Sequence, residues 1–231
     1  MAHGAGVGGA DALARLLLSA GWRRGQPGGY RGDLALDTSE LFTFLGAGQP
    51  REWERVVAGY DDADAAQRKF ARRVAGELDR RGVLDVLRRG VVDQGIAIRL
   101  ADPRGGGGTL GPDDRPSLIR DLHHTPSRPS RAVGLALFVN GVPVATVEVA
   151  DASGPGPRHA AERHRTGREP AGPLLGTRAL LHLAVGPGGV LAGTRPAGAQ
   201  TPFSTVTVTP GPPGVPFWRP GSVLGLLERL T

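Results

Sequence analysis

The clearest hydrophobic pattern in the chain lies at residues 133–151, VGLALFVNGVPVATVEVAD. Two apolar runs rich in β-branched residues flank Asn140 and Gly141, a dipeptide that tolerates positive φ and fits a two-residue type I′ turn. The pattern therefore predicts a β-hairpin. Alternation along its second arm places Glu148 on the face opposite Val147, so a carboxylate is expected beside a hydrophobic core.

Helical periodicity prevails over the first ninety residues. Apolar residues spaced three and four apart predict four helices, near residues 11–20, 38–46, 50–57 and 64–89. Asp11 is expected to cap the first helix, and Thr38 or Ser39 the second. Pro50 is expected to open the third, and Gly82 to interrupt the fourth.

The remaining segments alternate between strands, helices and loops. Residues 25–32 are rich in glycine but lack the lysine and Ser/Thr of a phosphate-binding loop, so they are interpreted as a linker. Further elements are predicted in order: a strand at 95–101, a glycine-rich loop at 102–114, a strand at 121–124, a helix at 159–168, paired strands at 178–185 and 189–194, an irregular Pro/Gly-rich segment at 196–220, and a last helix capped by Ser222.

These elements predict an α/β fold in which a mixed central sheet is flanked by helices, with a helical N-terminal region. Residues 1–32 are expected to form an N-terminal helix and flexible linker, and residues 33–231 a single domain. No apolar run approaches the ~20 residues needed to span a bilayer, so a cytoplasmic protein without membrane attachment is expected.

The chain carries a net charge of +6, and arginine supplies nearly all of its basic side chains, because Lys69 is the only lysine. Guanidinium groups suit phosphates, so double-stranded DNA is a reasonable partner. The alternative is that the arginine content reflects a GC-rich genome. If DNA binds, the expected contacts come from two arginine-rich helices and include Arg88, Arg89, Arg163, Arg165 and Arg168.

Other residue patterns limit the chemistry that is available. The chain has no cysteine, so any metal must be held by oxygen or imidazole. His123 and His124 are adjacent and would point to opposite sides of a strand, which disfavours a shared metal. A cluster of His159, Glu162 and His164 on the helix at 159–168 is conceivable, but a solvated helix is the simpler interpretation.

The hairpin sequence NGVPVATVEVAD resembles the N-terminal nuclease domain of the R subunit of type I restriction enzymes, in which the corresponding sequence is similar to LDLVLFLNGIPVATAELKN. The phrases LDTSELFTFL, QPREWERVV and ELDRRGVLDVLRRGV are similar to the same family, and the likeness extends over about residues 29–230. The resemblance implies a restriction-endonuclease-like fold of the PD-(D/E)xK type. It also implies Mg²⁺-dependent hydrolysis of DNA, in which two carboxylates hold the metal and a lysine assists the attacking water.

Aligned with this family, the chain keeps one of the three catalytic groups. The aspartate of the family falls on Gly134, the glutamate on Glu148 and the lysine on Ala150. Glu148 alone would hold Mg²⁺ weakly, so impaired cleavage is expected, by ~10³-fold or more. Asp151 is near in sequence, but strand alternation directs it to the face opposite Glu148.

Residues outside the three catalytic groups are also matched by the resemblance. The resemblance implies that an acidic residue of the helix at 64–89 contributes to the metal site, and Glu77 is the candidate. The alternative for Glu77 is an ion pair with Arg73 or Arg81, one helical turn away. A glutamine and a tyrosine of the family fall on Arg163 and His164.

Three hypotheses remain open at this level. The first is a type I restriction nuclease domain that has lost cleavage. The second is a non-enzymatic module that binds DNA or the methyltransferase and specificity subunits of a restriction complex. The third is a degraded remnant. The sequence contains no GxxxxGK(S/T) motif, so it has no predicted ATP site, and truncation before the helicase motor of the family is expected.

Overall fold

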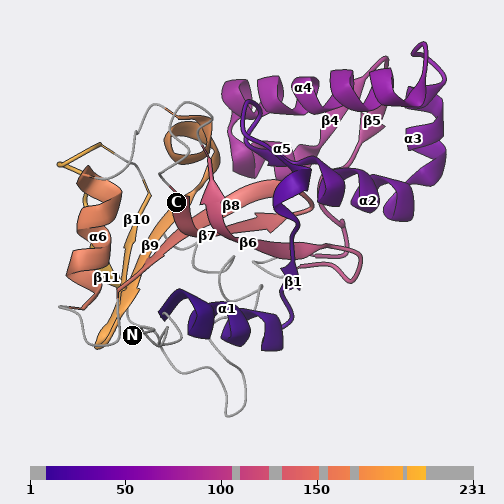
Figure 1. Cartoon of the computed structure of the whole chain (residues 1–231). Coiled ribbons are helices and arrows are strands. Elements are labelled where there is room, and N and C mark those ends of the chain that lie inside the picture. The colour runs from indigo at the N-terminus through magenta and orange to yellow at the C-terminus, as the bar shows by residue number, and fades with distance from the viewer. Residues whose placement is uncertain are drawn as a thin grey trace, which may run out of the picture.

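A mixed seven-stranded β-sheet, in the order β1-β6-β7-β8-β9-β10-β11, forms the centre of the computed structural model (Figure 1). The structure describes residues 9–105, 110–124, 132–150, 156–166, 172–194 and 197–206. The strands of this sheet are β1 Arg23–Arg24, β6 Pro116–His123, β7 Ala132–Val139, β8 Val142–Val149, β9 Leu181–Gly186, β10 Gly189–Gly193 and β11 Ser204–Val206. Two small hairpin sheets pair β2 Tyr30–Arg31 with β3 Leu36–Asp37, and β4 Val91–Asp93 with β5 Ile96–Ile98.

Both parallel and antiparallel pairs occur in the central sheet. Each strand of the series β6, β7, β8 pairs antiparallel with the next, and the same is true of β9, β10 and β11. The two groups join where β9 lies parallel to β8, and β1 lies parallel to β6 at the edge. A parallel pair needs a crossover, and helix α6, Pro157–Thr166, lies within the connection from β8 to β9.

Helices cover both faces of this sheet. Helix α1, Gly9–Ser19, packs on the face that carries Val147 and Leu183. Helix α6 packs on the opposite face, which carries Ala150 and Ala184. A third layer beside the sheet contains the remaining helices, α2 Thr38–Gly48, α3 Pro50–Val57, α4 Ala63–Arg81 and α5 Val83–Arg89 (Figure 1). Of the short turns, η1 Pro27–Gly29 contacts α2, and η2 Leu174–Arg178 packs its leucines on the sheet residues Ile119, Ala136 and Phe138.

The expected α/β architecture with a mixed sheet flanked by helices is therefore confirmed. None of the helices within the described residues is long and apolar enough to cross a membrane.

The central hairpin is confirmed in detail. Val139 pairs with Val142 across a two-residue turn, and Asn140 and Gly141 both have positive φ, 52° and 79°. The side chain of Asn140 fixes this turn, because its amide donates to the Asp114 carboxylate at 2.7 Å and its carbonyl accepts from the Arg115 backbone at 2.7 Å.

Several helix boundaries differ from those predicted. The N-cap of α2 is Asp37, whose carboxylate accepts from the Glu40 backbone at 3.2 Å, so Thr38 and Ser39 are helical residues. Helix α1 begins at Gly9, and Asp11 lies inside its first turn. Pro50 does open α3, and Gly82, with φ of 81°, does separate α4 from α5.

The glycine-rich segment at residues 25–32 is not a linker, and that interpretation is wrong. The Gly25 backbone donates to the Leu118 carbonyl at 2.8 Å, directly after β1 has paired with β6. The segment then forms η1 and β2, and β2 pairs with β3. Glycine allows the close approach here, since an added Cβ at Gly25 would lie 2.8 Å from Ile119.

The C-terminal part also departs from the pattern. The strand predicted from Arg178 begins at Leu181, because residues 174–178 form η2. The segment predicted to be irregular contributes β11 to the edge of the central sheet. The helix predicted after Ser222 lies outside the described residues.

Arg178 joins the C-terminal half of the chain to α4. Its side chain is 3% exposed, and its guanidinium binds the Asp79 carboxylate and donates to the Ala75 carbonyl at 3.0 Å. The hydrogen bond from Arg178 lowers the pKa of Asp79. The pair therefore fixes η2 against the helical layer.

Replacement of Arg178 by methionine is expected to lower the free energy of unfolding by about 2 kcal/mol, because the buried hydrogen bonds are lost. Urea denaturation of the wild type and the variant measures this. Asp79→Asn should cost less, because Arg178 keeps its hydrogen bond to the Ala75 carbonyl and the asparagine oxygen can still accept from the guanidinium. An equal cost for both variants would contradict this account.

Candidate functional site

Glu148 lies on β8 beneath α6, and it is 2% exposed. Leu135 of β7 pairs with Val147, so Gly134 is the neighbour of Glu148 across the hairpin. A Cβ added at Gly134 would lie 3.7 Å from Glu148 Oε2 and 3.1 Å from the Val147 carbonyl oxygen. Gly134, which the resemblance would match to the aspartate of the nuclease family, is thus adjacent to Glu148.

A cation reaches Glu148 from helix α6. Arg163 Nε lies 3.5 Å from Glu148 Oε2, and the same guanidinium donates a hydrogen bond to the Val149 carbonyl. The Arg163 side chain is 42% exposed, while that of Glu148 is 3% exposed. An ion pair of this kind stabilises the buried carboxylate and competes with a metal ion for it.

Ala150, which the resemblance would match to the catalytic lysine of the family, is packed against its neighbours. Ala150 is 3% exposed and belongs to a cluster of small side chains between α6 and the sheet, formed by Ala150, Ala160, Ala161 and Ala184. A lysine at position 150 would have to displace α6, since the methyl groups of Ala160, Ala161 and Ala184 pack around this position. The cation near Glu148 therefore comes from α6 instead of β8.

Two histidines occupy the same face beside Glu148. Thr146 Oγ1 lies 2.8 Å from His182 Nδ1, and His164 Nε2 lies 3.2 Å from the Leu183 carbonyl oxygen. The rings of His164 and His182 are 5.5 Å apart in an edge-to-face arrangement. Burial, and to a smaller extent the charge of His164, lowers the pKa of His182 to about 3.

His182 and Thr146 were not identified from the sequence. Both residues lie within apolar runs, and the one available signal was a histidine placed in the middle of a buried strand. Its neighbours on β8 and α6 come from distant parts of the chain, so the pattern of β9 alone gave no reason to connect them.

The other metal-binding predictions do not form a site. His159 is exposed, His164 is buried, and Glu162 pairs with Arg165 at 2.6 Å, so the three side chains considered as a cluster on α6 do not converge. Within the described residues, no group of three or more His, Cys, Asp or Glu side chains is placed to hold a metal ion. Asp151 lies outside the described residues.

Glu77 forms ion pairs within its own helix, which was the alternative to a role as metal ligand. Its carboxylate pairs with Arg80 and, at 3.2 Å, with Arg81 on the same helix. Arg73, the other partner considered, binds Asp93 instead. Glu77 therefore balances charge along α4.

The arginines predicted to contact DNA are largely used inside the protein. Arg163 binds Glu148, and Arg165 binds Glu162 and the Thr201 carbonyl at 3.0 Å. Arg89 is 79% exposed but pairs with Asp85, and Arg88 also has a partner. Arg168 lies outside the described residues.

The arrangement around Glu148 thus combines one buried carboxylate, one guanidinium and an empty neighbouring position. Mg²⁺ is usually held by one or two carboxylates together with phosphate oxygens and water, so Glu148 could supply a single ligand. The residues present fit poorly to a stable metal centre. Comparison of the chain with protein-family models, with curated proteins and with solved structures gave no match.

Proposed function

We propose that this chain is a DNA-binding protein built on the scaffold of a metal-dependent nuclease, and that its carboxylate site does not cut DNA. The observation that carries the proposal is the pairing of Glu148 with Arg163 next to Gly134, where the resembled family has a second carboxylate. A sheet flanked by helices with a central hairpin is also what a restriction-endonuclease-like fold requires.

The energetics favour the loss of cleavage. Phosphodiester hydrolysis of this type needs a metal ion that polarises the phosphate and lowers the pKa of the attacking water. With one carboxylate, and that carboxylate paired with a guanidinium, the local charge is close to neutral and attracts Mg²⁺ little. The missing stabilisation corresponds to ~10³-fold or more in rate.

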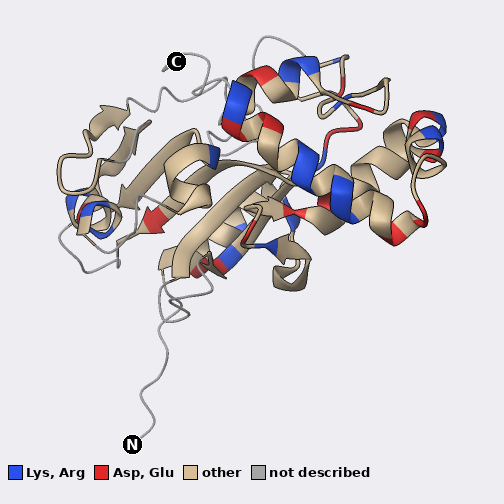
Figure 2. Ribbon diagram, turned by 90° about the horizontal axis from the view of Figure 1, so that it is seen from above, with Lys and Arg blue, Asp and Glu red and all other residues tan. Residues whose placement is uncertain are grey.

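The charge distribution supports the retention of DNA binding. The chain has a net charge of +6. Most acidic and basic side chains lie on the helices and connections, whereas the central sheet carries few of either (Figure 2). The helices carry both signs of charge (Figure 2), and the net excess of positive charge suits the phosphate backbone, which attracts cations regardless of base sequence.

A plasmid-nicking assay tests the loss of cleavage. We expect the full chain to leave supercoiled DNA intact with Mg²⁺ or Mn²⁺, and a gel shift on a linear duplex to detect binding under the same conditions. Cleavage that disappears in Glu148→Ala would overturn the proposal, because it would show that the site still works.

A second candidate is a residual nuclease in which Arg163 replaces the catalytic lysine. The 3.5 Å approach of its guanidinium to Glu148 favours this alternative, since it supplies a cation where the family has one. In that case Arg163→Gln and Glu148→Ala should both abolish cleavage, whereas Arg158→Gln, an exposed arginine on the same helix, should not.

A further inference from the structure

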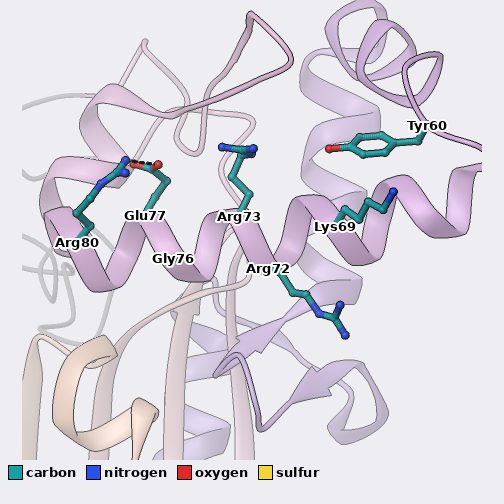
Figure 3. A pocket seen from close by; sticks show the side chains of 7 residues that line it. All are labelled: Tyr60, Lys69, Arg72, Arg73, Gly76, Glu77 and Arg80. Atoms are coloured by element: carbon teal, nitrogen blue, oxygen red, sulfur yellow. Dashed lines mark hydrogen bonds and ion pairs between the residues drawn. The ribbon is translucent and has the colours of Figure 1, made fainter.

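We infer that the backbone of duplex DNA binds in a hollow along helix α4, and not at the arginines of α5 and α6 that the sequence suggested. The inference rests on the proposed DNA-binding function and assigns it a site. The hollow has a volume of about 500 Å³ and is open to solvent (Figure 3). It is lined by Tyr60, Lys69, Arg72, Arg73, Gly76, Glu77 and Arg80.

The lining has an excess of positive charge in a linear arrangement. Four of its residues are cations and one is a carboxylate. Lys69, Arg73 and Arg80 follow one side of α4, because helical residues three or four apart lie one above the other, and the Arg72 side chain leaves the helix in the other direction at the edge of the hollow (Figure 3). Over these eleven steps the helix rises about 16 Å, which is long enough to meet several phosphates of one strand.

A buried carboxylate holds part of this surface in place. Asp93 is fully buried, and it accepts a hydrogen bond from the Tyr60 hydroxyl at 2.7 Å. Arg73 Nε lies 2.8 Å from the other oxygen of Asp93, and its side chain stays 49% exposed. Figure 3 shows the Arg73 guanidinium between the Glu77–Arg80 pair and Tyr60. Arg73 is therefore positioned in advance, with further N–H groups available to a phosphate.

Two other cations of the hollow are available to a ligand. Among the residues that the structure describes, no carboxylate pairs with Lys69 or Arg72; the Lys69 ammonium lies 5.2 Å from the centre of the Tyr60 ring. Gly76 lies between the cations, and an added Cβ there would meet nothing within 4 Å. The absence of a side chain at Gly76 leaves the middle of the hollow accessible to a backbone.

The chemistry of the lining favours a duplex over a single strand. Single-strand sites usually combine basic grooves with aromatic rings on which bases stack. The one aromatic residue of this hollow is Tyr60, whose hydroxyl binds Asp93 and whose ring is approached by Lys69. The hollow therefore provides phosphate contacts without a stacking platform, which suits a duplex whose bases remain paired.

Fluorescence anisotropy with a labelled duplex, measured with the full chain across a salt series, tests the site. The test variant is Lys69→Gln with Arg72→Gln. The matched control is Arg23→Gln with Arg24→Gln, which removes the same charge from two exposed residues of β1. We expect the test variant to bind the duplex about tenfold or more weakly, and the slope of its log affinity against log salt concentration (the salt slope) to fall by about 2. The control should keep most of the affinity and most of the salt slope of the wild type.

The outcomes separate this inference from the function on which it rests. No binding of the duplex by the wild type at low salt would overturn the proposed function. If the wild type binds the duplex and the α4 variant shows the same salt slope as the wild type, the inference alone is overturned. The same holds if the β1 control loses as much affinity as the α4 variant. Tighter binding of a single strand of the same sequence would overturn the assignment to a duplex. Thermal unfolding of each variant confirms that the fold is kept.

Discussion

Acidification from pH 7 to pH 3 is expected to remove up to about 4–5 kcal/mol of stability through His182 alone. Burial lowers the pKa of this histidine from its usual 6.5 to about 3, so the folded protein keeps it neutral. The unfolded chain binds the proton near pH 6.5. The stabilisation is therefore fully present above pH 6.5 and is lost as the pH falls toward 3. This free energy is a large part of the total stability of an ordinary domain.

Urea denaturation at a series of pH values measures this dependence. Other groups titrate in the same range, so the comparison is with His182→Gln, which removes the titration and can still accept a hydrogen bond from Thr146. The curve of the variant should be flatter between pH 6.5 and 3. His123→Gln, at an exposed position, should keep the slope of the wild type. If His182→Gln kept that slope too, the histidine would not be the buried neutral group described above.

Replacement of Gly134 by aspartate is expected to create metal affinity that the wild type lacks. The new carboxylate would lie beside the buried Glu148, since the Cβ position is 3.7 Å from Glu148 Oε2. Arg163 balances only one of the two charges, so without metal the variant should lose about 3 kcal/mol of stability. Mn²⁺ at about 100 times its Kd should return about 2.7 kcal/mol, a rise of about 5–10 °C in Tm.

Thermal unfolding with and without Mn²⁺ measures both effects. Gly134→Asn is the matched control, because it has the same size and the same 3.1 Å approach to the Val147 carbonyl but no charge. The asparagine variant should lose stability through the same steric strain, and Mn²⁺ should not raise its Tm. An equal response of the wild type to Mn²⁺ would mean that a metal binds without position 134, and the proposed loss of the site would be wrong.

The elements that the sequence predicted well have local causes. The hairpin at Asn140 and Gly141 depends on two residues that accept positive φ between β-branched runs. The break between α4 and α5 depends on Gly82 in the same way. Such signals are contained in a few adjacent residues, so they can be read without knowing what packs against them.

The predictions that failed depend on distant contacts. The glycines of residues 25–32 permit both a linker and a tight approach, and only the position of β6 selects the approach. The contacts of Arg163 and Arg165 within the protein also depend on packing, because Glu148 of β8 and the Thr201 carbonyl bind them once α6 is placed. That these arginines contact DNA stays a prediction. A basic side chain on a helix indicates which ligands suit it, and the packed structure decides whether a carboxylate already occupies it.

By itself the sequence determined the α/β architecture and the central hairpin, because periodicity and turn chemistry are local properties. Only the tertiary structure decided that Gly134 lies beside Glu148, that Arg163 neutralises this carboxylate, and that the exposed cations gather along α4. These relations depend on the register of the hairpin, which shifts between Leu137 and Phe138, and on which sides of α6 and α4 are packed. They depend on how the faces of the sheet are covered, and burial then sets which charges must be paired within the protein and which can face a ligand.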